Sequence, residues 1–480
     1  MINSLVHFPG GAAIALGAAF AALPLASIAQ TAGMIPMPKE HVQAIEAQGG
    51  LYDGPIATYV AQVGERAATA AGRAGQCGFH VLNSDVVNAF TSPPNCHVYI
   101  TRGLLGILNS EGELAATLGH EVGHVAANHA GKRQTRSVLT GLGALVLGAV
   151  TKSQEVAQIA SQVGQLNVLS YSRAQEFQAD DLSVQYMARA GYSAYSMSDV
   201  LQELQRDETL ETRLMGREGQ SVPGWARTHP LTSDRVARSA AAAQKSGPRP
   251  PDLTATRGIY LAAVDGLTYG DDAGQGFVSG RSFAHPGLGI GFQAPEGFSL
   301  SNGVNAVTIA GSKGKAQFST GRLGGGRLED YAVSVLRQVI GQTPAQFGQT
   351  QSTRINGLDA VIAPALVTNQ NGQQVEVLVA AYGVGGDAAY QFITQATAGS
   401  SNVFDPLIGS FHRLTAQESA SLKAKRIEVV TVRAGDTVAS LSQRMAFDTE
   451  REARFLMING LDAGAVLKPG RKVKLVTFRK

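Results

Sequence analysis

Apolar residues recur with helical spacing through the first half of the chain. Leu114, Leu118 and Val122 lie four residues apart, which places them on one face of an α-helix. Ser110 followed by Glu113 is a capping-box pattern of the kind that begins a helix. The same periodicity predicts further helices at 176–191, 196–207 and 232–244. In the last of these, Arg235, Arg238 and a run of alanines fit an outer helix.

Short segments of alternating apolar and polar residues replace this pattern from about residue 284. Such alternation is typical of strands with one buried face. A helix at 328–340 interrupts the strands, so an α+β domain is predicted at 284–415. This domain resembles small α+β domains of the PsbP/Mog type, and no clustered His, Cys or carboxylate residues suggest an activity for it. The predicted strands are 290–294, 306–310, 316–320, 358–363, 376–382 and 389–394.

Proline and glycine mark the boundary before this domain. The sequence SGPRPP at 246–251 ends the helical pattern, because these residues are unfavourable inside a helix. We expect a linker with one short helix, around 259–267, to occupy residues 246–283.

The C-terminal segment 427–477 has the pattern of strand, helix, helix and strand, and it resembles a LysM module. Asn459 and the Pro469-Gly470 pair stand where that family has its NxL and LxPG elements. LysM modules bind the N-acetylglucosamine chain of peptidoglycan, so the resemblance implies this partner for 427–477. A purely structural βααβ cap is the alternative.

Charge is concentrated in the same segment. Residues 421–480 contain 13 Lys and Arg against 6 Asp and Glu, a net charge of +7, whereas the whole chain carries only +3. A basic module on a neutral body suits an anionic partner, with a solvated basic face as the alternative that charge alone favours. The low overall charge excludes a nucleic-acid partner for the chain as a whole. With 480 residues, 44% hydrophobic and 16% charged, the protein is neither disordered nor fibrous.

The N-terminal segment predicts export. Residues 1–38 contain no Asp, Glu, Lys or Arg and include an apolar, alanine-rich run. Its end fits the small-x-small cleavage rule, so residues 1–29 are predicted to be a signal peptide cleaved near Ala29–Gln30, giving a periplasmic protein. An uncleaved anchor is the alternative, since about 20 apolar residues can span a bilayer. A second apolar run, 138–150, is too short to span and predicts at most peripheral membrane contact.

The two cysteines, Cys77 and Cys96, bracket a stretch that is predicted to form strands. An even and minimal number of cysteines in an exported protein indicates one disulfide. Two buried thiols are the alternative.

The sequence His120-Glu121-Val122-Gly123-His124 carries the clearest chemistry. Residues four apart share a helical face, so both imidazoles can bind one metal ion. Glu121 follows directly and is placed to hold a water molecule on that ion. This is the HExxH arrangement of zinc peptidases.

A zinc peptidase needs a third protein ligand, which leaves the fourth position for water. A third histidine in the pattern HExxHxxGxxH is absent, because Ala130 occupies its place and His129 is expected only to end the helix. The other source is a carboxylate from a later helix. Glu176 and Asp180 share a helical face, so Glu176 can bind the metal while Asp180 hydrogen-bonds a metal-binding histidine.

HExxH followed by the SRxxEFxAD pattern of residues 172–180 resembles the zinc metallopeptidases that include HtpX, BepA and the CAAX prenyl proteases. The segments VNAF at 87–90 and HVYITRGLL at 97–105 resemble the strands that precede the metal helix, and THP at 228–230 resembles the family's later His-Pro segment. The strand 97–101 is predicted to be a sheet edge that pairs with an extended substrate.

The resemblance implies a role for each matching residue. His120, His124 and Glu176 would bind one Zn²⁺ per chain, and Glu121 would be the catalytic base. His229 would lie near the metal as a transition-state donor or a fourth ligand, with a buried structural histidine as the alternative.

Together these patterns predict an α+β multidomain protein. A mainly helical gluzincin-type metallopeptidase domain with a small β element is expected at 37–245. The predicted function is an exported zinc endopeptidase that cleaves misfolded or misassembled envelope polypeptides. A latent peptidase acting mainly as a periplasmic chaperone or peptidoglycan-binding scaffold is the alternative.

Overall fold

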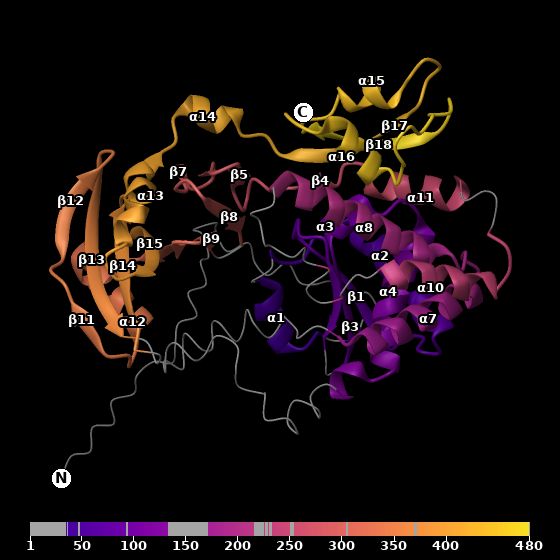
Figure 1. Ribbon diagram of the computed structural model, residues 1–480, viewed down its shortest axis with the longest axis horizontal. Helices are drawn as coiled ribbons and strands as arrows, with labels where there is room; N and C mark the ends of the chain where they lie inside the picture. Colours follow the sequence, from indigo (N-terminus) through magenta and orange to yellow (C-terminus); the bar gives the residue numbers. More distant parts are fainter. Residues whose placement is uncertain are drawn as a thin grey trace, which may run out of the picture. The chain divides into compact units, whose positions relative to one another are not determined.

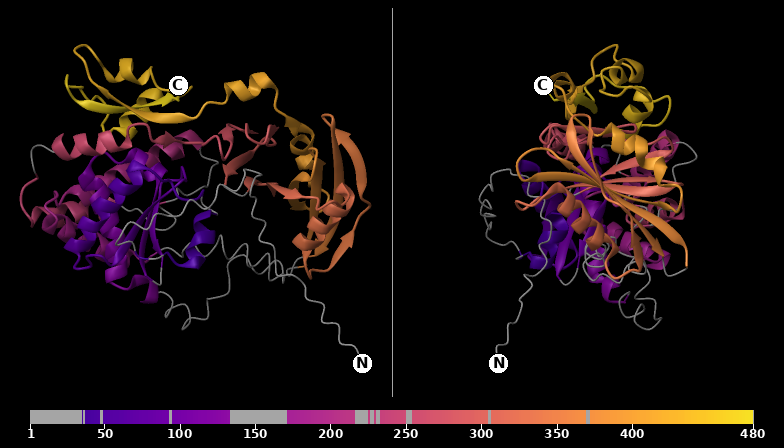
Figure 2. Two further views of the ribbon diagram at one scale, coloured as in Figure 1. Left: turned by 180° about the vertical axis from the view of Figure 1, so that it is seen from behind. Right: turned by 90° about the vertical axis from the view of Figure 1, so that its left-hand side faces the viewer.

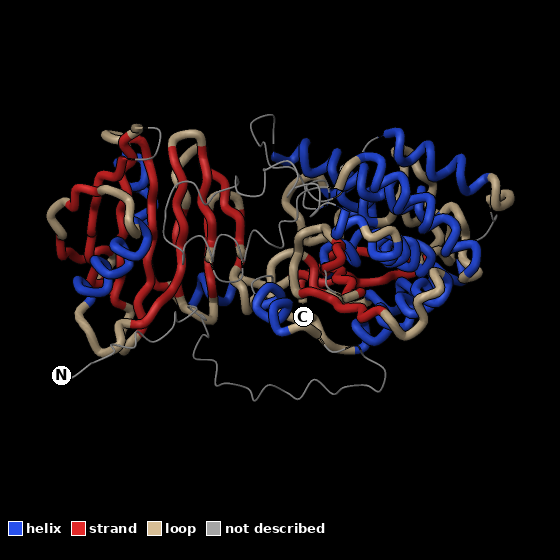
Figure 3. Tube along the Cα trace, turned by 90° about the horizontal axis from the view of Figure 1, so that it is seen from below, coloured by secondary structure: helices blue, strands red, loops and turns tan. Residues whose placement is uncertain are grey.

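The computed structural model forms two compact units, each with its own core (Figure 1). We call residues 35–132, 171–272 and 423–479 the helical unit and residues 273–422 the β unit. Figure 3 shows that helices predominate in the first and strands in the second. The structure describes residues 35, 37–46, 49–92, 95–132, 171–215, 225, 229, 233–249, 254–303, 306–368 and 372–479.

A small mixed sheet begins the helical unit. It consists of β1 (Cys77–Leu82), β2 (Ala89–Ser92) and β3 (Cys96–Thr101) in the order β1-β3-β2. β3 pairs with β1 in parallel and with β2 in antiparallel orientation. The prediction that residues 97–101 form a sheet edge is therefore wrong, because both sides of β3 already carry backbone hydrogen bonds. In this sheet, β1 and β2 are the edges.

Helices cover both faces of this sheet. α2 (Pro55–Ala70) packs against β1, and a Cβ atom at Gly64 would stand 2.4 Å from the ring of Phe79, so this close approach requires glycine. α4 (Glu111–Ala126) contacts α2 and the sheet, while α1 (Lys39–Glu46) covers the other sheet face. Further helices of the helical unit are α3 (Arg102–Ile107), α7 (Arg173–Arg189), α8 (Ser196–Met215) and α10 (Ser233–Gln244).

The C-terminal segment folds as strand, helix, helix and strand within the helical unit. β17 and β18 pair in antiparallel orientation, and their apolar side chains, such as Ile427 and Val473, belong to the same core as α2 and α4. The four elements are β17 (Lys425–Thr431), α15 (Val438–Ser442), α16 (Arg451–Ile458) and β18 (Lys472–Phe478). We call residues 425–478 the C-terminal module.

The expected linker at 246–283 is only partly a linker, which corrects the sequence prediction. Its helix, α11 (Thr254–Val264), buries Tyr260, Leu261 and Val264 completely in the core of the helical unit. The strand β4 (Thr268–Tyr269) then pairs with β17 of the C-terminal module. The apolar side chains of α11 make this segment part of the core.

The β unit contains a large antiparallel sheet in the order β11-β13-β14-β15-β10-β9-β8, with β12 also paired to β13. Its strands fan out with the twist visible in the right-hand view of Figure 2. The helix α12 (Leu328–Ile340) packs on β13 and β14. The strands of this sheet are β8 (Phe298–Asn302), β9 (Val307–Gly311), β10 (Gly314–Arg322), β11 (Ala345–Phe347), β12 (Gln351–Ile355), β13 (Leu358–Thr368), β14 (Gln374–Gly383) and β15 (Ala388–Thr397).

A smaller sheet in the order β16-β7-β6-β5 completes the β unit. A 3₁₀ turn at Ser401–Phe404 precedes its last elements. The elements are β5 (Phe277–Ser279), β6 (Ser282–His285), β7 (Ile290–Gln293), α13 (Asp405–Ser410), β16 (His412–Arg413) and α14 (Ala416–Ser421).

Two predictions concern segments outside the described residues, namely the signal peptide at 1–29 and the short apolar run at 138–150. Within the described part of the chain, no helix is both long and apolar enough to cross a bilayer.

Candidate metal centre

The helix α4 presents the HExxH residues and begins at a well-capped N-terminus. The Ser110 hydroxyl accepts a hydrogen bond from the Glu113 backbone N–H at 3.2 Å. The Glu113 carboxylate accepts from the Asn109 backbone N–H at 2.6 Å and from the Ser110 hydroxyl at 3.1 Å. These contacts satisfy N–H groups that a helix terminus would otherwise leave unpaired. The helix that follows places His120 and His124 one turn apart.

The helix α7 brings a carboxylate to these histidines. A capping box between Ser172 and Gln175 begins α7, so Glu176 falls in its first turn. α7 packs closely against α4, since a Cβ atom at Gly123 would stand 3.3 Å from the Ala179 carbonyl oxygen. The Ser183 hydroxyl also donates to a backbone carbonyl oxygen of α4 at 2.7 Å.

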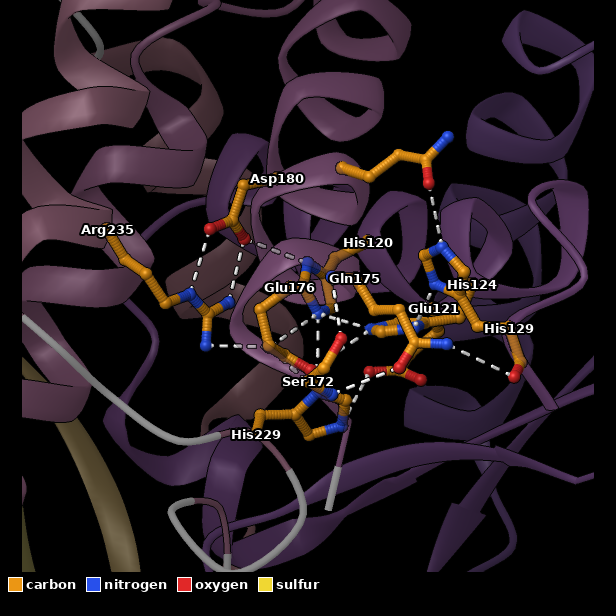
Figure 4. Close-up of polar contacts among 11 residues, drawn as sticks. His120, Glu121, His124, His129, Ser172, Gln175, Glu176, Asp180, His229 and Arg235 are labelled. Atoms are coloured by element: carbon orange, nitrogen blue, oxygen red, sulfur yellow. Dashed lines mark hydrogen bonds and ion pairs between the residues drawn. The ribbon is translucent and has the colours of Figure 1, made fainter. Parts of the chain in front are cut away.

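Four buried side chains converge at this point, as Figure 4 shows: His120, His124, Glu176 and His229. One ligand atom from each lies within 4.8 Å of the others. His124 Nε2 is 3.0 Å from His120 Nε2 and 3.5 Å from Glu176 Oε1. His229 Nδ1 is 3.0 Å from Glu176 Oε1 and 3.4 Å from His120 Nε2.

The chemistry of this donor set fits a metal ion such as zinc, which proteins bind through imidazole nitrogens and carboxylate oxygens. The neighbouring Glu121 supports the same conclusion. Its side chain is fully buried, and neither carboxylate oxygen has a hydrogen-bond partner among the described residues. His229 Nε2 lies 3.4 Å from Glu121 Oε1. Burying a carboxylate without a hydrogen bond costs free energy of folding. Such a carboxylate is expected in a site where a bound water molecule or substrate supplies the hydrogen bond.

Asp180 and Arg235 contact the metal-binding candidates His120 and Glu176 and hold their side chains in place. Asp180 Oδ1 lies 3.0 Å from His120 Nδ1, which leaves His120 Nε2 directed into the cluster. Arg235 donates from Nε and Nη2 to the two Asp180 oxygens at 2.8 and 2.7 Å, and its Nη1 lies 2.8 Å from Glu176 Oε2. The sequence pattern suggested that Arg235 lies on an outer helix. Most residues of α10 are exposed or half-buried, as in an outer helix, but the Arg235 side chain itself is only 1% exposed.

His129 was expected only to end the helix, yet it contacts the metal-binding candidates. Its Nδ1 lies 2.9 Å from His124 Nδ1, and its Nε2 lies 3.0 Å from the Gln178 side-chain oxygen. The Tyr171 ring stacks on His124 with centroids 3.8 Å apart, and the Trp225 ring stacks on His229 at 4.4 Å. The contacts of His129 with Gln178 and of Tyr171 with His124 join distant segments, so no local motif identified them.

Burial and neighbouring charges shift the pKa values of the carboxylates in different directions. Burial raises the pKa of Glu121 above its ordinary value, although His229 and His120 oppose the shift. Burial also acts to raise the pKa of Glu176, but His229 and Arg235 outweigh it and hold that pKa below the ordinary value. Asp180 shows the same balance, and Arg235 lowers its pKa to about 2. Glu176 and Asp180 are therefore anionic at neutral pH.

The structure joins Cys77 and Cys96 in a disulfide between the first residues of β1 and β3. It lies on the sheet rather than among the metal-binding candidates. Its place is consistent with a structural role.

Comparison with known proteins identifies the class of enzyme to which this arrangement of residues belongs. Residues 56–242 match the model of "Peptidase family M48" and include every residue of the cluster. The chain therefore contains a zinc metallopeptidase domain of family M48, as the resemblance in sequence implied.

Two curated relatives illustrate the similarity. A "Beta-barrel assembly-enhancing protease" of Yersinia pestis is 27% identical over 223 residues, which covers 44% of this chain and 43% of the relative. A "Mitochondrial metalloendopeptidase OMA1" of Arabidopsis thaliana is 32% identical over 124 residues, covering 26% and 25%. The chain thus spans less than half the length of these relatives.

Among solved structures, a cyanobacterial PsbP from Synechocystis sp. PCC 6803 matches 30% of this chain and 98% of its own, with 13% identity and a TM-score of 0.24. A match at this TM-score carries no functional conclusion for this chain.

Proposed function

We propose that this protein is an exported zinc endopeptidase that cleaves misfolded or misassembled envelope polypeptides. The observation that carries the proposal is the convergence of His120, His124 and Glu176 beside the buried carboxylate of Glu121. His229 belongs to the same cluster, so we assign it either a ligand position through Nδ1 or the stabilisation of a developing negative charge.

In this proposal one zinc ion is held by His120, His124 and Glu176. Bound zinc supplies Lewis-acid chemistry, since it lowers the pKa of a water molecule toward about 7 and polarises a carbonyl group. Asp180 fixes the orientation of His120, and Arg235 holds Asp180 and Glu176 in place.

Glu121 moves the protons of the reaction. Its carboxylate accepts a proton from the attacking water and then delivers it to the leaving amine of the cleaved peptide. The raised pKa of Glu121 suits this exchange, because a group that both accepts and donates works best when its pKa approaches the working pH. His229 Nε2, 3.4 Å from Glu121 Oε1, is near enough to influence the same proton.

The location and partners of the enzyme rest on the sequence and on the names of its relatives. The name "Beta-barrel assembly-enhancing protease" refers to the assembly of β-barrels, and the N-terminal segment has the pattern of a signal peptide. These two observations support our proposal that the enzyme is periplasmic. Its substrates are polypeptides. We retain peptidoglycan as a partner of residues 427–477, for which the supporting observations are the LysM-like pattern and the net charge of +7 over 421–480.

One observation favours the alternative of a latent peptidase with a chaperone or scaffold role. The side chains of His120, Glu121, Glu176 and His229 are all 0% exposed, and that of His124 is 1% exposed. A substrate carbonyl reaches the cluster only if the site opens. In the latent form this opening needs a partner or a modification.

The experiment compares purified protein with its Glu121→Gln and His120→Ala variants. Casein and muropeptides are assayed side by side, with and without a chelator, and zinc is measured by elemental analysis. We expect chelator-sensitive casein cleavage, with zinc retained but cleavage abolished in Glu121→Gln, and zinc lost in His120→Ala. Wild-type turnover by Glu121→Gln would remove Glu121 from the mechanism, and zinc-loaded but inactive wild-type protein would favour the latent form.

A further inference from the structure

A second polar pocket lies in the helical unit and shares no residue with the metal cluster. It has a volume of about 280 Å³. The start of α4, the helices α8 and α11, and the connection between α16 and β18 of the C-terminal module form its walls. The residues that matter for its chemistry are Asn109, Glu113, Glu203, Arg257 and Arg471.

Several polar atoms in this pocket are buried but have no hydrogen-bond partner among the described residues. The donors are Arg257 Nε and Nη2 and Arg471 Nε, and the acceptors are Asn109 Oδ1 and Glu203 Oε2. Asn109 is only 3% exposed and Glu203 only 6%. The Asn109 amide nitrogen donates to the Ile107 carbonyl oxygen at 2.9 Å, which leaves Oδ1 as the group without a partner. Buried polar atoms are normally paired, so these atoms indicate that a ligand completes the pocket.

Arginines also outnumber carboxylates in the lining of the pocket, with Arg206, Arg249, Arg257 and Arg471 against Glu113, Asp199 and Glu203. Arg206 pairs with Glu203 at 3.0 Å and with Asp462 at 2.8 Å, and Arg249 pairs with Asp199. Arg257 and Arg471 form no ion pair with any carboxylate of the described part of the chain.

The two arginines therefore place two positive charges in the pocket that no directly paired carboxylate neutralises. Burial, together with the positive charge of Arg471, lowers the pKa of Arg257 to about 10, although the carboxylates of Glu113 and Glu203 oppose the shift.

We propose that this pocket binds a small hydroxylated oxyanion, a phosphate or carboxylate of about the size of a monosaccharide. The guanidinium groups of Arg257 and Arg471 bind the oxyanion, because their planar arrays of N–H donors match its oxygens. Asn109 Oδ1 and Glu203 Oε2 accept hydrogen bonds from hydroxyl or amide groups of the same ligand. The volume of the pocket restricts the ligand to a small one.

The site joins two parts of the helical unit. Arg471 belongs to the C-terminal module, whereas Asn109 and Arg257 belong to the part that carries the metal cluster. A ligand bound to all three stabilises the packing of the module beside the first turn of α4. Binding should therefore raise the thermal stability of the unit, because the ligand binds only the folded state.

The test measures binding to the full chain by calorimetry and by thermal unfolding, at matched ionic strength. The ligands are glucose 6-phosphate, N-acetylmuramic acid and the neutral sugar N-acetylglucosamine. We expect at least one of the two anions to bind and raise the midpoint of unfolding, and the neutral sugar to do neither. Binding of the phosphate or of the muramic acid alone supports the proposal and identifies which oxyanion the site takes.

Variants of Arg257 and Arg471 test whether the anion binds in this pocket. Arg257→Gln/Arg471→Gln should weaken anion binding about a hundredfold, about tenfold for each guanidinium, without lowering the midpoint of unfolding in the absence of anion. Arg471→Gln alone should weaken binding about tenfold and serves if the double variant does not fold. Arg433→Gln removes an exposed arginine of the same module and should leave binding unchanged.

Three results would overturn the oxyanion site: neither anion binds, the neutral sugar binds as tightly as the anions, or the Arg257 and Arg471 variants bind like the wild type. Zinc content and casein cleavage of the wild-type protein, measured in parallel, test the proposed peptidase separately. Each proposal can therefore fail without the other.

Discussion

At the scale of single residues, the candidate metal centre depends on side chains that position other side chains. Arg235 connects Asp180, which contacts His120, with Glu176, which faces the metal position. Three charged groups at 0–1% exposure are stable only because each is paired with another. Arg235 is therefore a positioning residue for two of the proposed zinc ligands.

We predict that Arg235→Gln lowers the affinity for zinc by about 10- to 100-fold, the usual effect of losing a residue that orients metal ligands. Competition with a zinc chelator of known affinity measures the change. Arg238→Gln is the matched control, since Arg238 lies on the same helix but is exposed and pairs with Asp181. Equal zinc affinity in Arg235→Gln and in the wild type would show that Arg235 does not position the ligands.

At the scale of elements, the two faces of the sheet formed by β1, β3 and β2 pack against different helices. One face packs on α2 and α4 through apolar side chains such as Val81 and Val98. The other face carries His80, His97 and Tyr99 under α1, where His80 Nε2 lies 3.2 Å from His97 Nδ1. Burial lowers the pKa of His80 to about 4, with His97 and His41 adding to the shift.

This shift predicts a loss of stability in acid. The folded pKa of His80 lies below its unfolded value of 6.5, so the neutral form is favoured in the folded state. The contribution of His80 is complete above pH 6.5 and falls as the pH drops toward 4, because the unfolded chain binds the proton first. Between pH 7 and pH 5 we expect a loss of about 2 kcal/mol in the free energy of unfolding.

Denaturant unfolding at both pH values measures this loss, and His80→Phe supplies the comparison. The phenyl ring retains stacking on Tyr99 but does not titrate, so the variant should show a smaller loss between pH 7 and pH 5. An identical pH dependence in the variant would mean that other groups are responsible.

At the scale of the whole molecule, the chain divides into two compact units rather than three domains in series. The C-terminal module shares its core with the metallopeptidase domain, and Ile427 of β17 packs 3.7 Å from the position that a Cβ atom at Gly106 would take. Lys474 of β18 is fully buried and donates to the carbonyl oxygens of Gly106 and Leu108 at 2.8 and 2.6 Å. These contacts lie just before the metal helix.

We therefore predict that the module and the metal centre unfold together. Ile427→Ala should lower the stability of the helical unit by about 2–5 kcal/mol, as for other fully buried aliphatic residues. The single tryptophan of the chain, Trp225, stacks on His229 and makes fluorescence a probe of the metal centre. Its unfolding transition should shift in Ile427→Ala but not in Val466→Ala, whose side chain is 85% exposed. An unchanged transition in Ile427→Ala would show that the module is energetically separate.

The sequence by itself determined the helices, strands and site residues that can be identified from the spacing of nearby residues. The helical spacing of α4 places His120, Glu121 and His124 together in any fold that keeps the helix. A shared helical face made Glu176 and Asp180 candidates, and the family resemblance assigned their roles and added His229. Strand alternation likewise anticipated β13, β14 and β15, because side-chain direction along a strand has a period of two.

Only the tertiary structure decided the contacts between distant segments. The sequence pattern assigned Arg235 to an outer helix and an edge position to β3, yet the Arg235 side chain is buried and β3 is the central strand, because these features depend on which elements pack against them. The same holds for α11, whose apolar face is covered by the core of the helical unit, and for the packing of the C-terminal module. Local periodicity states that a face is apolar but does not state what will cover it.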